Sequence, residues 1–306
     1  MAIAAFTGAP PTQDQEPAVR RKSGIALVLL LPGVLYLVLF FLTPLISLII
    51  TSFQAPVPDG DIGQYQAAFQ WSNYTDSIAE YWPQIIRSFV YALIATAAAL
   101  VISYPLAYFI GVKMRGRAVL QNLLMTLVIA PFFISFLLRT LAWKSILSDD
   151  AWVASTLKAL SILPPDAHIT GTPFSVIFGL TYNFIPFMTL PLYSTLERLD
   201  VRLLEAGQDL YANAWTTFRK VTVPLSMPGI VSGTLLTFIP AAGDYINASQ
   251  DFLGAADTSM MGNVIESNFL VLQNYPAAAS MSVILMAVIL VIVGVYVRRS
   301  GTEDLL

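Results

Sequence analysis

Residues 205–224 read EAGQDLYANAWTTFRKVTVP, a polar stretch inside a chain whose other long segments are apolar. Glu205 and Ala206 open a run with helical character, a less regular middle follows around Asn213, and Pro224 stands where the next apolar run begins. The pattern predicts a helix, a turn and a second short helix. We interpret the stretch as a docking loop on the cytoplasmic side of a membrane.

The composition excludes an ordinary soluble domain. Of the 306 residues, 56% are apolar and only 11% are charged, and the mean hydropathy is positive. Six apolar windows are each long enough for the roughly 20 residues that cross a bilayer. We therefore expect an all-α membrane protein with six transmembrane helices, near residues 25–52, 86–111, 119–138, 173–194, 223–243 and 276–297.

The distribution of Lys and Arg predicts the orientation. With both termini in the cytoplasm, twelve basic residues fall in cytoplasmic segments and four in outer ones, which follows the positive-inside rule. This topology places the 205–224 loop in the cytoplasm. Residues 1–22 are rich in Ala, Pro and Gln and are expected to form a disordered cytoplasmic tail, ahead of a transmembrane domain at 23–306.

Motifs of enzymatic chemistry are absent from the sequence. It contains no P-loop, no GxSxG, no HExxH, no Cys and a single His168. We expect no catalytic residue, no metal site, no cofactor bound by this chain and no nucleic-acid partner. If ATP drives the protein, the nucleotide chemistry belongs to a separate chain.

In its spacing, the 205–224 loop resembles the EAA loop of binding-protein-dependent ABC importer permeases, which fits a groove on an ATPase subunit. That pattern has Glu-Ala-Ala, then a Gly four residues after the second Ala, and Ile-x-Leu-Pro at the end. Gly207 replaces the second Ala and Tyr211 replaces the Gly. Because Tyr takes a positive φ less readily than Gly, the first helix is expected to run on through 211 or to turn differently.

The resemblance implies that this loop couples the chain to an ATPase. The alternative is an amphipathic interfacial helix without a partner. The residues to which the resemblance assigns coupling are Glu205, Ala206, Gly207, Asp209, Ala212 and Trp215.

Further segments resemble the first of the two membrane subunits of spermidine/putrescine importers. The resemblance implies a type I importer permease fold in the inner membrane of a prokaryote and an obligate second permease. It also implies two copies of an ATPase that hold ATP and Mg, and an extracytoplasmic polyamine-binding protein. A permease for a sugar, thiamine or ferric ion, and a channel or secondary carrier, are the alternatives. The segments are PGVLYLVLFFLTPLISLIITSF (32–53), PFFISFLLRTLAWKSIL (131–147), PLYSTLERLDVRLLEAGQDL (191–210) and FIPAAGDYINASQDFLG (238–254).

Asp244 is the principal candidate for a substrate contact. It follows Pro240 and Gly243 at the end of the fifth expected span, where a helix can break and expose its backbone to a cavity. Ionisable groups at membrane depth are costly and usually face a polar pathway. Asp244 and Tyr245 together would offer a carboxylate and an aromatic face to an ammonium group, and Asp251 would add a second carboxylate. The alternative is an Asp that caps the helix boundary.

Arg139 and Trp143 lie at the outer end of the third expected span and complete the predicted substrate path. We expect Arg139 to pair with an acid such as Asp244 or with a backbone carbonyl, or else to snorkel to the interface. Trp143 is either an interfacial anchor or a wall of the path.

Overall fold

A computed structural model describes residues 24–209 and 211–299, and the expected tail at 1–22 lies outside the described residues. The chain divides into two units between Ser47 and Leu48. The first unit contains α1 (Gly24–Leu37), the π-helical η1 (Val38–Leu42) and the start of α2 (Thr43–Ser52). Its apolar residues belong to a candidate membrane span, Leu29–Ser52.

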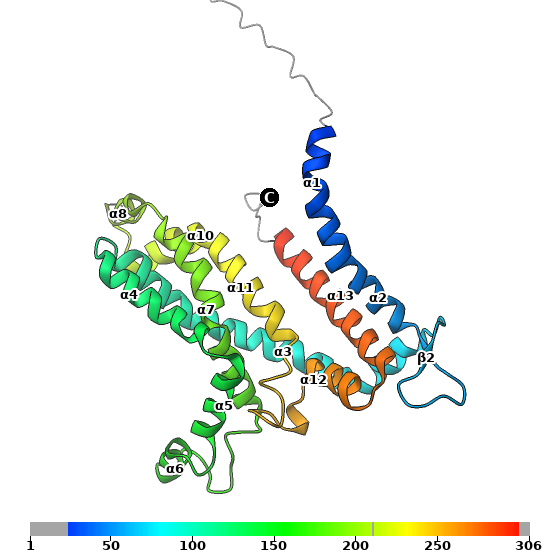
Figure 1. Cartoon of the computed structure of the whole chain (residues 1–306). Coiled ribbons are helices and arrows are strands. Elements are labelled where there is room, and N and C mark those ends of the chain that lie inside the picture. Colours follow the sequence, from blue (N-terminus) through cyan, green and yellow to red (C-terminus); the bar gives the residue numbers. More distant parts are fainter. Residues whose placement is uncertain (1–23, 210, 300–306) are drawn as a thin grey trace, which may run out of the picture. The chain divides into compact units, whose positions relative to one another are not determined.

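The second unit is built around three helices that pack on one another (Figure 1). Small residues make this packing close, because Ala92, Ala95 and Ala99 are fully buried and leave room for neighbouring backbones. A Cβ on Gly233 would lie 3.0 Å from the Met188 carbonyl oxygen. The three helices are α3 (Ser72–Tyr108), α7 (Pro173–Glu197) and α11 (Met227–Ala242).

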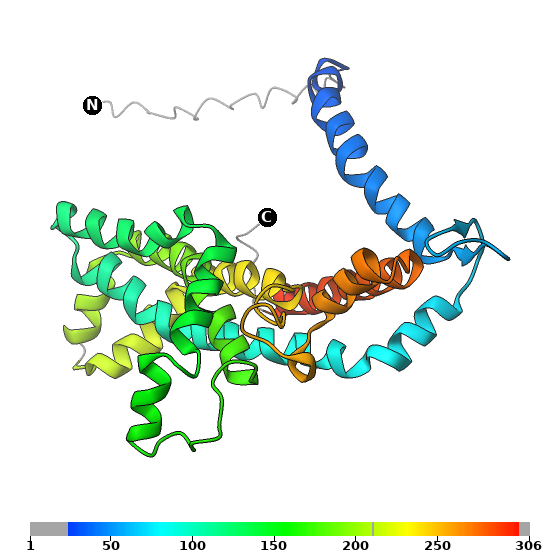
Figure 2. The ribbon, with the colours of Figure 1, turned by 60° about the horizontal axis from the view of Figure 1, so that its bottom comes forward.

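A further long helix, α13 (Tyr275–Arg299), packs along α3. Figure 2 shows it in red, beside the yellow α11. A two-stranded antiparallel hairpin, with Ala55 paired to Gln66, is the one sheet in the described residues of this otherwise helical chain. The other elements are β1 (Ala55–Pro56), β2 (Tyr65–Gln66), η2 (Phe109–Lys113), α4 (Ala118–Ile129), η3 (Ala130–Phe133), α5 (Phe136–Leu147), α6 (Trp152–Ala159), α8 (Val201–Asp209), α9 (Ala214–Thr217), η4 (Phe218–Thr222), α10 (Val223–Leu225), η5 (Ala256–Thr258), α12 (Met261–Glu266) and η6 (Ser267–Val271).

The helices provide four candidate membrane spans, or up to six if each of two bent pairs counts as one span. The expected helix 119–138 is wrong as a single helix, because the chain bends by 93° between Ala118–Phe133 and Phe136–Ala159. Ile134 and Ser135 have extended ψ angles at this break, just after Pro131.

The helix expected at 223–243 is also bent, by 67°, between Ala214–Leu225 and Met227–Ala242. The helix expected to begin near 86 instead begins at Ser72 and contains a kink at Tyr81, where the backbone is not helical. Pro83 lies just after this kink, and its ring removes one helical N–H donor. The helix thus begins 14 residues before the predicted start at 86, because it includes the more polar residues that precede the apolar window.

Candidate functional site

The segment from α8 to α10, residues 201–225, forms the helix, turn and second helix that the sequence predicts. We call it the α8–α10 loop. Helix α8 ends at Asp209, so the predicted continuation through residue 211 is wrong. Tyr211 has a φ of +58°, and the Ala212 N–H donates to the Gly207 carbonyl oxygen at 3.1 Å. This is the helix ending that usually places Gly in the left-handed position, and here Tyr211 takes that conformation.

The second half of the α8–α10 loop begins with a side-chain cap. Asn213 accepts a hydrogen bond from the Thr216 N–H at 2.7 Å, which satisfies one free donor at the start of α9. Gly207 is buried where α8 meets α9, and a Cβ there would lie 3.1 Å from Thr217 Oγ1. A glycine at this position therefore allows the two helices to approach closely.

The predicted coupling residues of the loop are mostly exposed. Glu205, Ala206 and Asp209 are exposed, Ala212 is half-buried, and Trp215 is 68% exposed. Tyr211 is also exposed, so two aromatic rings stand at the surface near the turn. The sequence singled out Tyr211 only for its departure from Gly. Exposed aromatic rings on a braced turn suit contact with a protein partner.

Arg115, on the turn before α4, caps the end of α7 just ahead of the α8–α10 loop. Its guanidinium donates to the carbonyl oxygens of Leu199, at 2.8 Å, of Leu196, at 3.2 Å, and of Glu197. These carbonyls have no helical partner at a helix C-terminus, so a cation there satisfies and stabilises them. Leu204 of α8 is buried in the same core as Leu196 and Leu199. Sequence reasoning used Arg115 only to predict topology.

Residues 243–255, the post-α11 segment, contain most of the predicted substrate contacts. Asp244 is only 7% exposed, and its carboxylate accepts both the Asn247 backbone N–H, at 2.7 Å, and Asn247 Nδ2, at 3.1 Å. Asn183 Nδ2 of α7 donates to Asn247 Oδ1, at 3.1 Å, and to Thr140 Oγ1, also at 3.1 Å. Asp244 is thus part of a buried polar network that joins α5, α7 and the post-α11 segment.

Asp251 and Trp143 lie where the segment meets α5 and α7. The Asp251 side chain is exposed, and its backbone carbonyl accepts a hydrogen bond from Lys144 Nζ at 2.8 Å. Trp143 is half-buried and packs edge-on against Phe178 and Tyr182 of α7, with ring centroids 4.7 and 5.2 Å away. The Trp143 ring therefore fixes α5 on α7.

Arg139 is buried, and in the described residues its Nε and Nη1 atoms have no hydrogen-bond partner. Its guanidinium lies 5.5 Å from the centre of the Phe136 ring. The expected ion pair with Asp244 is not formed, because the ion pairs found among the described residues all involve Asp149. The snorkelling alternative is also wrong in this conformation, because the side chain is only 8% exposed.

A cavity of about 310 Å³ lies beside α12, and Tyr245 is the predicted site residue that lines it. We call it the α12 cavity. Burial raises the pKa of Glu266, and the nearby Asp251 raises it further. Sequence reasoning counted Glu266 only among the acids of the outer loops, although its spacing of three residues from Phe269 places both on one helical face. The lining residues are Gly243, Tyr245, Gly262, Ile265, Glu266, Phe269 and Leu270.

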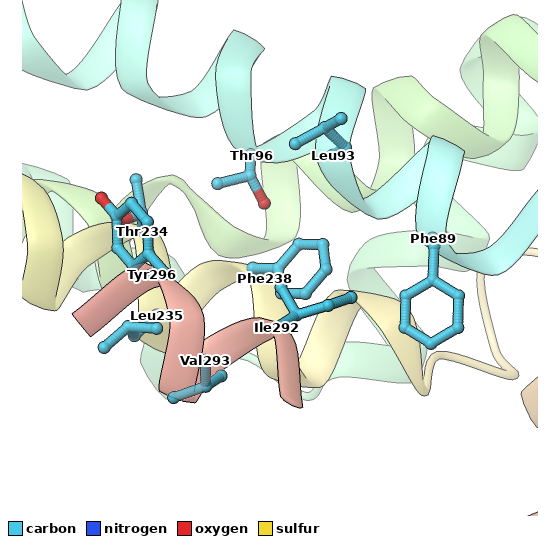
Figure 3. A pocket seen from close by; sticks show the side chains of 9 residues that line it. All are labelled: Phe89, Leu93, Thr96, Thr234, Leu235, Phe238, Ile292, Val293 and Tyr296. Carbon is cyan, nitrogen blue, oxygen red and sulfur yellow. The ribbon is translucent and has the colours of Figure 1, made fainter. Parts of the chain in front are cut away.

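A second cavity, of about 300 Å³, lies between α3, α11 and α13 (Figure 3). Apart from two threonines and a tyrosine, its walls are hydrocarbon. Thr234 and Tyr296 share a hydrogen bond of 2.8 Å. None of the described residues that line this cavity is charged, so none of them can pair with a cation. Its lining residues are Phe89, Leu93, Thr96, Thr234, Leu235, Phe238, Ile292, Val293 and Tyr296.

The helical arrangement is shared with solved ABC importers. A chain in the crystal structure of a bacterial ABC transporter that imports the acidic polysaccharide alginate has a TM-score of 0.65 at 16% identity, covering 92% of this chain and 96% of that one. The alginate transporter in complex with an alginate pentasaccharide-bound periplasmic protein gives 0.63 at 15% identity, covering 91% and 94%. The chain therefore shares its fold with a chain of each of these two structures.

The sequence defines the family. The model of binding-protein-dependent transport system inner membrane components matches residues 103–300. The spermidine/putrescine transport system permease protein PotB of Escherichia coli (strain K12) is 37% identical over 266 residues, which cover 87% of this chain and 94% of that protein. The chain belongs to the binding-protein-dependent transport system inner membrane components. It is a multi-pass transport protein of the inner membrane. The family resemblance predicted from the sequence is confirmed.

Proposed function

We propose that the chain is one of two permease subunits of an ATP-driven importer that carries spermidine or putrescine into the cell. The single observation that carries the substrate class is the 37% identity to a spermidine/putrescine permease across 87% of this chain. An extracytoplasmic binding protein delivers the polyamine, a second homologous permease completes the pathway, and two ATPase subunits hold ATP and Mg.

The proposed topology has six membrane spans and both termini in the cytoplasm. Counting each bent helix pair as one span gives six candidate spans, in agreement with the six apolar windows of the sequence. The excess of Lys and Arg in the segments assigned to the cytoplasm supports this orientation. The α8–α10 loop then faces the ATPases, and the post-α11 segment faces the outside.

Coupling to the ATPases is proposed to run through the α8–α10 loop and α7. Glu205, Ala206, Asp209, Ala212 and Trp215 would contact the ATPase groove, with Gly207 holding the two short helices together. At the other end of α7, Ser175 Oγ donates to the Leu253 carbonyl oxygen at 2.7 Å. The 25 residues of α7 span about 37 Å, so this helix joins the two regions mechanically.

The proposed substrate path begins at the outer ends of α5, α11 and α12. Asp244, Tyr245 and Asp251 belong to it, together with Arg139 and Trp143 on α5. The exposed Tyr245 and Asp251 are open to the substrate, whereas the buried Asp244 and Arg139 and the half-buried Trp143 shape the walls of the path. Acidic groups attract a polyamine by long-range electrostatics, and their binding must be moderate for the substrate to leave again.

Reconstitution of the importer in proteoliposomes tests this function. The two permeases, the ATPase and the polyamine-loaded binding protein should accumulate labelled spermidine only when ATP is present on the ATPase side. Sugar, thiamine and ferric ion, supplied with the same binding protein, serve as control solutes. Uptake that does not require ATP would contradict the ABC mechanism, and uptake of a control solute in place of spermidine would contradict the substrate class.

A further inference from the structure

The α12 cavity brings together one carboxylate and two aromatic rings from separate segments. Tyr245 follows α11, Glu266 ends α12, and Phe269 lies in η6. Both Tyr245, which is 45% exposed, and Phe269, which is 53% exposed, line the cavity. The volume of about 310 Å³ is at the lower end of small-molecule pockets, which suits one end of a flexible ligand.

The walls of the cavity are held in place by contacts outside it. The Tyr245 carbonyl oxygen accepts a hydrogen bond from Asn263 Nδ2 at 2.6 Å, which ties the post-α11 segment to α12. The Phe269 ring packs edge-on against Tyr275, with ring centroids 5.3 Å apart. A Cβ on Gly262 would lie 2.6 Å from the Asp244 carbonyl oxygen, so only glycine permits this approach of α12. A cavity with fixed walls loses little entropy when a ligand binds.

The charge of the cavity is uncompensated. Across residues 24–209 and 211–299, no hydrogen bond or ion pair reaches the Glu266 carboxylate, which is partly buried. The nearby Asp251 adds further negative potential, which is why its charge raises the pKa of Glu266. A cation that enters the cavity would pair with the Glu266 carboxylate and offset the negative potential of Asp251. The aromatic faces of Tyr245 and Phe269 also favour a cation, and their hydrocarbon edges suit methylene groups.

We propose that Tyr245, Glu266 and Phe269 form a subsite for a terminal ammonium group of the polyamine and the methylene groups next to it. The inference rests on the proposed function, because the substrate class comes from there. It assigns the carboxylate contact to Glu266 and leaves Asp244 the task of holding the segment that carries Tyr245. Glu266 is a binding residue in this scheme, whereas Asn247 and Asp244 act through the position of Tyr245.

Cysteine protection in the assembled importer tests the subsite, because this chain has no native cysteine. Leu270→Cys introduces a thiol on the cavity wall, and its modification by a cationic methanethiosulfonate is followed on this chain after electrophoretic separation. Spermidine should slow the modification at least fivefold when Glu266 is present and less than twofold with Glu266→Gln. Glu80→Gln, a change of the same type at an exposed position on α3, should keep the full protection.

The aromatic contribution is tested in the same assay. Phe269→Tyr should preserve protection by spermidine, whereas Phe269→Leu should weaken it at least threefold, because an aliphatic side chain has no negative ring face. In the ionic-strength control, NaCl replaces spermidine at the same ionic strength. Asp257→Cys, placed outside the cavity, should react at the same rate with and without spermidine.

Three results would overturn the subsite. One is equal protection with Glu266 and with Glu266→Gln. Another is a Leu270→Cys thiol that reacts in the isolated subunit but is inaccessible in the assembled importer, because the partner permease would then cover the cavity. The third is absence of protection while the wild-type importer accumulates spermidine, which leaves the proposed function standing. If the wild-type importer accumulates no spermidine, the proposed function fails and the subsite fails with it.

Discussion

The α8–α10 loop and the post-α11 segment lie at opposite ends of α7 (Figure 1), and they are held by different kinds of interaction. In the loop, hydrogen bonds join residues a few positions apart, as from Ala212 to Gly207. In the post-α11 segment, side chains far apart in sequence meet, as Asn183 does with Asn247. The loop exposes most of its predicted functional side chains, whereas the segment buries Asp244 and Asn247.

This difference predicts two classes of mutational effect. A substitution on the exposed face of the loop changes a surface that a partner recognises, and the permease fold remains intact. A substitution in the buried network leaves polar groups without partners, so it affects folding and transport together. Arg115, which lies outside the loop, belongs to the second class, because it donates to three carbonyls at the end of α7.

The largest effect is expected from Asp244→Asn. The amide NH2 of the new Asn side chain would face Asn247 Nδ2, which is itself a donor. One buried N–H group would then have no acceptor. We expect a loss of about 1–3 kcal/mol in stability, with a lower midpoint of thermal unfolding and at least a tenfold fall in spermidine uptake. Thermal unfolding of the purified importer and uptake at low spermidine measure the two losses.

Asp257→Asn, on the exposed η5, is the matched control and should change neither quantity. If Asp244→Asn keeps full thermal stability but loses uptake, Asp244 contacts the substrate directly. The contrast between an exposed loop and a buried structural network would then be wrong for this residue. Full stability together with full uptake would remove Asp244 from both roles.

The loop was predictable from sequence because its structure is local. The register of Glu205 and Pro224 identified a helix, a turn and a helix, and each of these is fixed by hydrogen bonds within the segment. The error concerned Tyr211. Intrinsic propensity disfavours Tyr in the left-handed backbone conformation. Tyr211 nevertheless adopts it, next to a helix α8 that is held in place by the buried Leu204 and Gly207.

The candidate substrate site was less predictable because it depends on contacts between distant segments. An acid after a Pro-Gly break drew attention to Asp244, but no local pattern reveals that Asn247 and Asn183 enclose it. Glu266 enters the cavity only because Gly262 lets α12 approach the post-α11 segment. Arg139 was expected to find an acid or the interface, and its burial depends on how α5 packs against α7, which no local pattern predicts.

A smaller effect on the protein, confined to assembly, is expected from substitutions on the loop surface. Glu205→Ala and Ala212→Glu should reduce copurification of the ATPase and ATP-dependent uptake about tenfold, the equivalent of about 1.4 kcal/mol of interface energy. The midpoint of thermal unfolding of the isolated permease should not change, because Glu205 is exposed and Ala212 is half-buried.

Affinity copurification and uptake are measured on the same preparations, with Arg202→Ala on the exposed start of α8 as a control for loss of a loop charge. Normal ATPase binding and transport in both variants would show that the loop is not the docking surface. A lower thermal midpoint in either one would show that the loop is tied to the fold more tightly than its exposure indicates.

The smallest effect is expected from Tyr211→Gly, which restores the residue found at this position in the EAA pattern. Tyr211 pays the cost of a left-handed backbone, roughly 1–2 kcal/mol, while glycine takes the same conformation freely but loses more entropy on folding. We expect a net gain of about 1 kcal/mol in local stability, so the Ala212 amide, which donates to Gly207, should exchange its hydrogen roughly fivefold more slowly. Tyr211→Ala keeps the strain and removes the ring, so its exchange rate should stay close to that of the wild type. If Tyr211→Gly slows exchange but both variants lose ATPase binding, the exposed ring contributes to docking and the strain is retained for that contact. If Tyr211→Gly accelerates exchange, the turn does not carry the strain that its φ angle implies.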